Sequence, residues 1–326
     1  MHTHKIAVVI PCYKVKKHIK EVLKAIPKVI GKIYVVDDYC PEGSGQFIAS
    51  FNKDPRVSII YHSKNKGVGG AVISGYKQAL ADKQSIIVKL DGDGQMDPVF
   101  IPNLIKPILE EQADYTKGNR FFTLESLSSM PNIRKFGNAC LSFINKISSG
   151  YWDIMDPTNG FTAIHQTALK LLPLNKLENR YFFESDMLFR LGTVRAVVKD
   201  IPMRSIYKNE DSNLQINQTI MSFPKLYCKS FFKRVFYNYF LRDFNRASIE
   251  LVLGISFILF GTIWGAAQWA QSIHQMTEAS TGTVMLAVLP IIIGFQMLLD
   301  AIKFDADNVP QKPLQKLSLN NWLNLK

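Results

Sequence analysis

Two long apolar stretches near the C-terminus limit what this chain can fold into more than any other feature of its sequence. They cover residues 249–270 and 283–302. Each is about 20 residues long and would form a helix of about 30 Å, which matches the hydrocarbon core of a bilayer. Stretches of this length and hydropathy are rare inside soluble proteins. The sequence therefore predicts two transmembrane helices, with a buried pair of core helices as the alternative.

The charges around these stretches predict their orientation. The connector of residues 271–280 contains no lysine or arginine, whereas the chain after Ile302 contains four lysines. The positive-inside rule then places both ends of the helix pair in the cytoplasm and the connector outside. A GxxxG pattern at Gly261 and Gly265 is compatible with close helix packing or with a homo-oligomer, and it also arises by chance.

The segment of residues 223–248, directly before the first apolar stretch, mixes nine aromatic residues with six lysines and arginines. Such a composition is typical of helices that lie among lipid headgroups and bind anionic membrane lipids. An RNA-binding surface would use the same residue types. Because the segment adjoins a predicted membrane span, we favour the membrane surface.

Composition narrows the class of partner. The chain has 326 residues and a formal net charge of +12, which indicates an anionic partner such as a phosphorylated small molecule, an acidic membrane surface or nucleic acid. Nucleic acid is not favoured, because many of the cations cluster beside the predicted spans. The four cysteines and six histidines are scattered, and this indicates neither a disulfide framework nor a zinc site.

The part of the chain before residue 219 alternates between two patterns. Strand-like segments occupy residues 5–13, 32–38, 57–62 and 85–93, and helix-like segments lie between them at residues 15–30, 43–52 and 69–82. This alternation predicts an α/β domain with a parallel sheet that is covered by helices on both faces. Ligands of such sheets bind beyond the carboxyl ends of the strands, and polar residues gather there in this sequence.

Asp91 and Asp93 follow the strand-like segment that ends near residue 90. Two carboxylates about 6 Å apart repel each other by roughly 3 kcal/mol at an effective dielectric constant near 20. A hard divalent ion, Mg²⁺ or Mn²⁺, would relieve this repulsion, and the side-chain oxygen of Gln95 could add a further ligand. The alternative is a solvated Asp-Gly turn.

Two other strand ends suggest ligand contacts. Asp37 and Asp38 could accept hydrogen bonds from a base or a ribose, or they could cap the next helix. The glycine-rich stretch of residues 65–80 opens a helix, whose backbone N–H groups could face an anion. Tight turns also use glycine, so this signal is weak. The sequence has neither the P-loop pattern nor, after its first strand, the dinucleotide-binding pattern.

Eight segments together make a stronger pattern than any one of them. In chain order they are VVIPCY, VVDDYCPEGS, NKGVGGA, LDGDGQMDP, KGNRF, RKFGN, DPTNGF and FFESDML. With these segments the chain resembles glycosyltransferase family 2 over residues 6–215, and in particular the polyprenyl-phosphate glycosyltransferases that include dolichyl-phosphate mannose synthase. The resemblance implies a Rossmann-like GT-A fold that binds a nucleotide-sugar, linked to UDP or GDP, together with Mg²⁺ or Mn²⁺.

The resemblance also implies roles for individual residues. The nucleotide-sugar would contact Pro11, Tyr13, Asp37, Asp38, Lys66, Gly67, Asp91, Gly92, Arg120, Asp156 and Asn159. The metal ligands would be Asp91, Asp93 and Gln95. The acceptor phosphate would contact Arg120, Arg134 and Asn138. The catalytic group would comprise Asp91, Asp93, Arg134, Glu184 and Asp186. Residues 201–214 look like a loop that closes over the site.

Each of these roles has a plainer alternative. Arg120 and Arg134 could be surface charges, and Asp156 with Pro157 could form an ordinary turn. Glu184 and Asp186 could cap a helix or pair with structural cations.

The predicted chain has four regions. They are a cytoplasmic GT-A catalytic domain (1–218), interfacial helices (219–248), two transmembrane helices (249–303) and a cytoplasmic tail (304–326). The implied enzyme is an inverting transferase of the bacterial inner membrane. It would move a hexose to polyprenyl phosphate, and in a bacterium this would be undecaprenyl phosphate. The alternatives are a family 2 transferase with a saccharide or another lipid as acceptor, and a catalytically dead, membrane-anchored binding protein.

Overall fold

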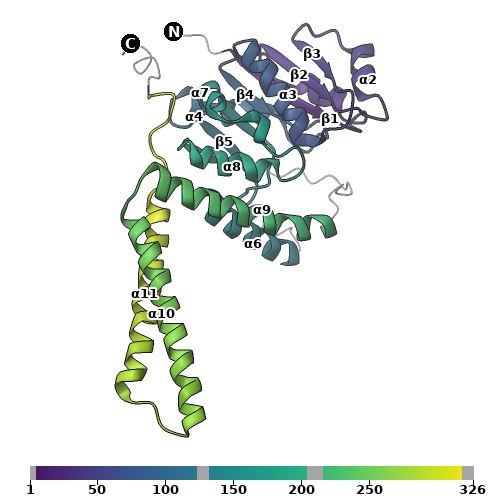
Figure 1. The fold of residues 1–326 in the computed structure, drawn as a ribbon. Coiled ribbons are helices and arrows are strands. Elements are labelled where there is room, and N and C mark those ends of the chain that lie inside the picture. Colours follow the sequence, from purple (N-terminus) through teal and green to yellow (C-terminus); the bar gives the residue numbers. More distant parts are fainter. Residues whose placement is uncertain (1–4, 123–131, 204–215, 318–326) are drawn as a thin grey trace. The chain divides into compact units, whose positions relative to one another are not determined.

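The computed structural model describes residues 5–122, 132–203 and 216–317, apart from the side chains of residues 132–134 and 216–222. These residues form two compact units. The first contains the chain up to Phe231 together with the segment from Pro310 onward, and the second is Phe232–Val309 (Figure 1).

The first unit is built around a seven-stranded sheet with the strand order β3-β2-β1-β4-β6-β5-β7. In chain order the strands are β1 (Ile6–Cys12), β2 (Lys32–Asp37), β3 (Val57–Tyr61), β4 (Ile86–Lys89), β5 (Tyr115–Asn119), β6 (Thr162–His165) and β7 (Val198–Pro202). The first four strands pair in parallel with their neighbours. β6 is antiparallel to both β4 and β5, whereas β5 and β7 are parallel.

The parallel arrangement predicted for the first four strands is therefore confirmed, whereas β6, which was not predicted, runs antiparallel to its neighbours. For a strand to join a sheet in parallel, the chain must cross over from the carboxyl ends of the strands to their amino ends. β6 makes no such crossover. It begins at the carboxyl ends of β4 and β5, because its first residue, Thr162, pairs with both Lys89 and Lys117. The residues just before β6 are thereby held beside the carboxyl ends of the two neighbouring strands.

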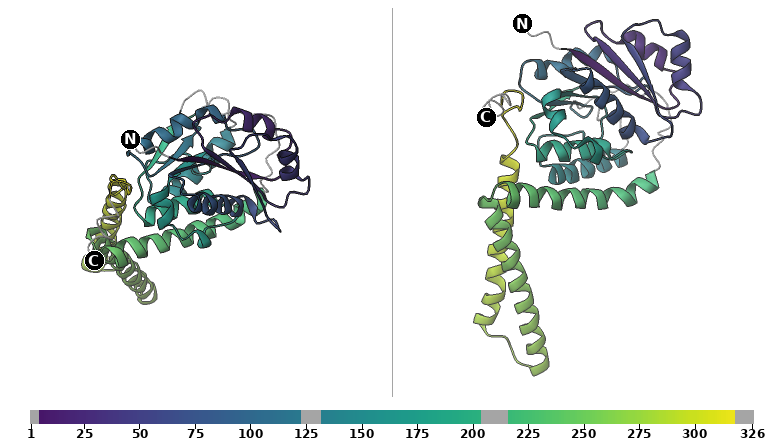
Figure 2. Two further views of the ribbon diagram at one scale, coloured as in Figure 1. Left: turned by 90° about the horizontal axis from the view of Figure 1, so that it is seen from above. Right: turned by 45° about the horizontal axis from the view of Figure 1, so that its top comes forward.

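Helices cover both faces of this sheet (Figures 1 and 2). In chain order, the helices that begin in the first unit are α1 (Ile19–Ala25), α2 (Ser44–Phe51), α3 (Gly67–Ala81), α4 (Ile101–Leu109), α6 (Asn132–Ser149), α7 (Gln166–Leu171), α8 (Phe183–Thr193) and α9 (Ile216–Phe236), with short 3₁₀ turns η1 (Pro98–Phe100) and η2 (Leu174–Lys176). Alternate residues of β1 serve the two faces. Ile6, Val8 and Ile10 belong to the core shared with α1 and α4, whereas Val9 packs against α3 at Gly75.

The second unit contains a π-helical turn, η3 (Tyr237–Arg242), and two long helices, α10 (Arg246–Gln275) and α11 (Thr281–Asp307). The two helices run side by side as a hairpin (Figures 1 and 2). By length and composition both are candidate membrane spans, and most of their side chains are not buried. α10 begins before the apolar stretch, because Asn245 and Ser248 form a capping box at its first turn.

Glycines set the contact between α10 and α11. A methyl group on Gly261 would lie 2.5 Å from the carbonyl oxygen of Ala287, and one on Gly254 would lie 2.9 Å from the carbonyl oxygen of Gly294. A methyl group on Gly265 would come within 3.1 Å of the Ala287 side chain. The GxxxG pattern thus brings two helices of the same chain together, as small residues do between membrane helices.

Residues 310–317, which we call the C-terminal strap, lie in the predicted tail and pack onto the first unit. The fully buried carboxylate of Asp114 accepts hydrogen bonds from the backbone N–H groups of Leu314 at 2.8 Å and Gln315 at 3.1 Å. It also accepts one from Val197 at 2.9 Å. The Gln315 side chain donates to the carbonyl oxygens of Ile108 and Ala113, near the end of α4. Burial raises the pKa of Asp114.

Candidate active site

The loop after β4 places Asp91 and Asp93 at the carboxyl end of a central strand. Gly92 is buried, and a methyl group on it would lie 3.3 Å from Ile19, so even alanine would require a small shift of the neighbouring side chains. Gly94 has a φ of +74°, which favours glycine. The Asp93 carboxylate accepts a hydrogen bond from the backbone N–H of Gln95 at 2.9 Å, which closes the turn.

Lys89 is a residue of the site that the sequence interpretation missed. It is the last residue of β4 and only 1% exposed. Its ammonium group lies 3.0 Å from Asp91 Oδ1 and 2.9 Å from Glu184 Oε1, so it links the acidic loop to the first turn of α8. Burial alone would lower the pKa of Lys89, but the two carboxylates outweigh burial and hold that pKa well above its usual range.

The loop before β6 reaches the same place through Gly160. A methyl group on Gly160 would collide with the Lys89 ammonium and would lie 2.8 Å from Asp91 Oδ2. A larger residue at position 160 would require the side chains of Lys89 and Asp91 to shift. The DPTNGF segment therefore meets the LDGDG segment in the structure.

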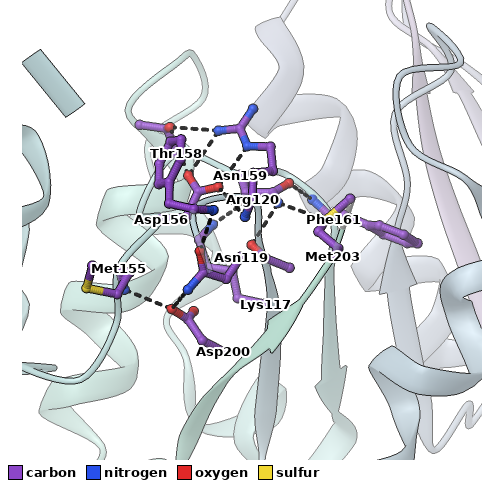
Figure 3. Close-up of polar contacts among 12 residues, drawn as sticks. Lys117, Asn119, Arg120, Met155, Asp156, Thr158, Asn159, Phe161, Asp200 and Met203 are labelled. Atoms are coloured by element: carbon purple, nitrogen blue, oxygen red, sulfur yellow. Dashed lines mark hydrogen bonds and ion pairs between the residues drawn. The ribbon is translucent and has the colours of Figure 1, made fainter. Parts of the chain in front are cut away.

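Arg120 and Asp156 form a bidentate ion pair at the end of β5 (Figure 3). The Arg120 guanidinium donates to Asp156 at 2.7 Å and 3.0 Å, and the backbone N–H of Arg120 donates to the same carboxylate at 3.2 Å. The Asp156 side chain has no exposed surface, whereas 31% of the Arg120 side chain is exposed. Both residues were predicted to contact substrate, and the structure shows that they bind each other.

Lys117 and Asn159 connect β5 to the loop that precedes β6. The Lys117 ammonium, which is fully buried, donates to the carbonyl oxygen of Asn159. The Asn159 side chain donates to the carbonyl oxygen of Gly118 at 2.7 Å and accepts from the backbone N–H of Phe161 at 3.0 Å (Figure 3). Burial lowers the pKa of Lys117 to about 8, although nearby carboxylates oppose this shift. Sequence reasoning missed this lysine too.

Asp200 completes the support of the loop from β7. Its carboxylate accepts from the Asn119 side chain at 3.0 Å and from the backbone N–H of Met155 at 2.8 Å (Figure 3). Burial raises the pKa of Asp200 to about 6. The loop of residues 155–161 is therefore held by side chains of two strands and is preorganised before any ligand binds.

Asp37 and Asp38 have structural partners at the other end of the site. Asp37 accepts from the backbone N–H groups of Cys40 at 2.8 Å and Gly45 at 2.6 Å. Asp38 accepts from the backbone N–H groups of Lys66 at 2.8 Å and Gly67 at 2.7 Å, and its carboxylate lies 2.7 Å from His62 Nδ1. Both carboxylates thus bind backbone N–H groups at helix starts, Asp37 at α2 and Asp38 at α3, although the N-cap residues of these helices are Gly43 and Lys66.

At the start of α3, two of the backbone N–H groups that could have faced an anion already have partners in the protein. The Gly67 N–H donates to Asp38, and the Gly70 N–H donates to the carbonyl oxygen of Asn179 at 3.0 Å. The glycines serve close packing instead, because a methyl group on Gly69 would collide with the backbone near Glu178. The negative charge at this helix N-terminus is the Asp38 carboxylate.

The remaining predicted residues lie in several places. Pro11 is buried at the end of β1, and Tyr13 just beyond it is 45% exposed. The Asp186 carboxylate accepts from the backbone N–H of Glu178 and from Arg190, so it stabilises the start of α8 rather than facing Asp91.

Two predictions fall wholly or partly beyond what the structure describes. Arg134 and Asn138 both belong to α6, four residues apart, but the side chain of Arg134 is outside the described residues. Residues 204–215, most of the predicted closing loop, are also outside them.

The donor set of the acidic loop suits a hard divalent ion. Among the described residues, no group of three or more His, Cys, Asp or Glu side chains is arranged to hold a metal by itself. Asp91 Oδ1 is buried and lies close to Lys89, yet it receives no well-aligned hydrogen bond from the described residues. Asp91 and Glu184 together bring two negative charges against the single positive charge of Lys89, and a cation at the acidic loop would balance the excess. Mg²⁺ and Mn²⁺ suit sites where phosphate oxygens complete the coordination.

The mixed sheet, with the acidic loop at the carboxyl end of its central strand β4, defines a GT-A glycosyltransferase. Among solved structures, glucosyl-3-phosphoglycerate synthase from Mycobacterium tuberculosis matches this fold with a TM-score of 0.52 and 16% identity, over 71% of this chain and 78% of its own. The model of glycosyl transferase family 2 matches residues 7–172, and the chain belongs to this family. The predicted family and fold are thus confirmed.

Two curated relatives extend the comparison. The chain is 31% identical over 216 residues to UDP-N-acetylglucosamine–dolichyl-phosphate N-acetylglucosaminyltransferase from Methanococcus voltae, which covers 62% of this chain and 86% of the relative. It is 26% identical over 192 residues to undecaprenyl-phosphate mannosyltransferase from Micrococcus luteus, which covers 56% of this chain and 78% of the relative.

Proposed function

We propose that this family 2 transferase moves a hexose from a nucleotide-sugar to the phosphate of a polyprenyl phosphate at a membrane. One observation carries the proposal: a family 2 catalytic unit and two candidate membrane spans occur in one chain. The names of both relatives above contain a polyprenyl-phosphate acceptor, which supports the same substrate class for this chain. The acceptor is embedded in the bilayer, so an enzyme that uses it benefits from a membrane anchor.

For the orientation we propose that the catalytic unit lies in the cytoplasm. The lysines beyond α11 and the lysine-free connector between α10 and α11 support this orientation by the positive-inside rule. The cations and aromatic rings of residues 223–248 would bind anionic lipid at the cytoplasmic surface. In a bacterium this membrane is the inner membrane, and the acceptor is undecaprenyl phosphate.

For the donor we propose that Asp91, Asp93 and Gln95 hold Mg²⁺ or Mn²⁺ together with the diphosphate. The ion would neutralise the negative charge that builds up on the leaving nucleoside diphosphate. The M. tuberculosis enzyme of the same fold was crystallised with Mn²⁺ and UDP, which supports this assignment. Tyr13, exposed beside the buried Pro11, is the candidate contact for the nucleoside.

For the chemical step we propose direct displacement with inversion. A phosphate monoester is largely dianionic at pH 7, so its oxygen is already a nucleophile and requires no protein base. This oxygen forms a bond to the anomeric carbon while the bond from that carbon to the diphosphate breaks. The nucleoside diphosphate leaves with the electron pair. Arg134 and Asn138, on consecutive turns of α6, are the candidate residues for the acceptor phosphate.

Product analysis tests this proposal. Membranes that contain the protein are incubated with a panel of UDP- and GDP-sugars and polyprenyl phosphate, and lipid products are identified by mass spectrometry. We expect one donor to yield a polyprenyl-phosphate sugar. A labelled saccharide or other lipid without this product would favour the alternative acceptor, and no turnover of any donor would favour a binding protein.

The metal assignment has its own test in the same assay. Asp93→Asn should abolish formation of the lipid-linked sugar while the circular dichroism spectrum stays that of the folded protein. Full turnover by this variant, or by the wild type in excess EDTA, would refute the assignment.

A further inference from the structure

Lys89 stands where the strand pattern calls for an aliphatic residue. Its neighbours in β4, Ile86, Ile87 and Val88, are fully buried, and Lys89 itself is 1% exposed. A buried ammonium group is costly unless it is paired. Replacing a buried ion pair with apolar side chains of similar size is often neutral or even stabilising. Stability of the fold therefore does not explain why a lysine occupies this position.

The contacts of Lys89 point to the reaction instead. Three segments far apart in the sequence meet at its ammonium group: the acidic loop at Asp91, the loop before β6 at Gly160, and α8 at Glu184. Both carboxylates lie within 3.0 Å of the same nitrogen, and therefore within about 6 Å of each other. The Lys89 ammonium group therefore attracts both carboxylates to the same position.

We propose that Lys89 is a positioning residue of the transfer reaction, which holds the carboxylates of Asp91 and Glu184 at fixed places in the donor site. For the reaction this inference rests on the proposed function, whereas the positions of the two side chains are observed. Without the ammonium group, two like charges would face each other across a poorly solvated gap. Their repulsion exceeds the cost of rotating a side chain, so at least one carboxylate would turn away.

The sign of a change in metal affinity tests this inference. We measure Mn²⁺ binding to the full-length protein by electron paramagnetic resonance, with a nucleoside diphosphate present. If Lys89 were only a nearby positive charge, Lys89→Met would tighten Mn²⁺ binding, because a repulsive charge is lost. Positioning predicts the opposite, a loss of affinity of about tenfold or more, as seen when residues that orient metal ligands are removed. Unchanged or tighter binding by folded Lys89→Met would overturn the inference.

A strand lysine away from the site provides the matched control. Lys199 in β7 bonds to the Gln112 side chain at an exposed position. Lys199→Met should bind Mn²⁺ like the wild type. Loss of Mn²⁺ affinity in this control as well would mean that removing any strand lysine disturbs the site, and would count against a specific role of Lys89.

A double-mutant cycle with Glu184 supplies the kinetic test. Lys89→Met and Glu184→Gln should each lower kcat by about tenfold or more, while the KM for polyprenyl phosphate stays within about twofold. If the two residues act as one unit, the double variant is no slower than the slower single variant. Losses that multiply would overturn the inference. The double variant removes both charges together, so it keeps the test open if Lys89→Met alone does not fold.

The outcomes separate this inference from the proposed function. Suppose that the wild type forms no lipid-linked sugar with any donor, yet Lys89→Met weakens Mn²⁺ binding. Then the proposed acceptor is wrong and the positioning of Asp91 by Lys89 stands. Suppose instead that the wild type forms the product and Lys89→Met equals it in both Mn²⁺ affinity and kcat. Then only the inference about Lys89 fails.

Discussion

The ion pair of Arg120 and Asp156 joins the end of β5 to the loop that precedes β6. Asp156 is fully buried, so removing its partner would leave an uncompensated charge in the interior. We expect Arg120→Leu to lower the free energy of unfolding by about 3 kcal/mol. Arg120→Lys keeps the charge but loses the bidentate geometry, and should lose less. Thermal unfolding in detergent checks the order, and equal stability of Arg120→Leu and the wild type would contradict it.

Asp200 should make the stability of the folded protein depend on pH. Because burial raises its pKa from 3.8 to about 6, the folded protein favours the protonated carboxyl group. Its contribution to stability is therefore complete below about pH 4, declines between about pH 4 and 6, and is lost above that range. Asp200→Asn should remove roughly 3 kcal/mol of this dependence. If the free energy of unfolding changed by the same amount in variant and wild type between pH 4 and 7, the prediction would be contradicted.

At the residue scale, sequence patterns predicted the positions of residues that depend on local sequence and missed contacts between residues far apart in the chain. Asp91 and Asp93 were placed correctly at a strand end, because the aliphatic run before them and the glycine between them are visible in the sequence. Lys89 looks like an ordinary solvent-facing strand residue. Its role depends on Glu184, which is 95 positions away in the chain, and no local pattern contains that contact.

Among the elements, α3 links the predicted glycine motif to α8. A methyl group on Gly69 would collide with the Glu178 carbonyl oxygen and would lie 2.9 Å from the Phe183 side chain, next to Glu184. Gly69→Ala should therefore displace the start of α8 and lower both stability, by about 1–3 kcal/mol, and transferase activity. Activity and a melting temperature like those of the wild type would refute this.

Gly137 provides the matched control for this substitution. It is also a helical glycine, in α6, but a methyl group there would have no neighbour within 4 Å among the described residues. Gly137→Ala should therefore raise stability by about 0.5–1 kcal/mol, because alanine is the better helix former. Opposite signs in the two variants would identify packing, rather than helix propensity, as the reason for the glycine at position 69.

Helices and strands were predicted well where a stretch of sequence has a clear strand or helix periodicity in its apolar residues. β1, β2, β4 and α3 lie within a few residues of their predicted bounds, because apolar runs and glycines mark where they begin and end. The orientation of β6 was not predicted, since the direction of a strand depends on the path that the chain takes around it. The same holds for the amides of α3, whose partners come from distant loops.

At the scale of the whole molecule, the C-terminal strap makes the first unit discontinuous in sequence. We expect Leu314→Pro to remove the hydrogen bond from residue 314 to Asp114 and to destabilise the first unit by about 1–3 kcal/mol. Hydrogen exchange and limited proteolysis should then show residues 310–317 released from the unit. Gln311→Pro, at an exposed position of the same segment, is the control and should leave exchange in the strap unchanged.

The return of the strap to the first unit could not be predicted from the sequence. Residues 310–317 have no helical or strand period, and their anchor, Asp114, precedes them by 200 positions. The two candidate spans were predicted because hydropathy over about 20 residues is a local property.

The strap also has a consequence for biosynthesis. Asp114 leaves the ribosome long before Leu314, so during synthesis its carboxylate lacks two of its backbone donors until the strap has been made. On the proposed membrane insertion, the strap reaches that carboxylate when both ends of the hairpin emerge on the same face of the bilayer. We therefore expect a chain that inserts only one of the two candidate spans to keep an incomplete first unit and to be degraded faster than a correctly inserted chain.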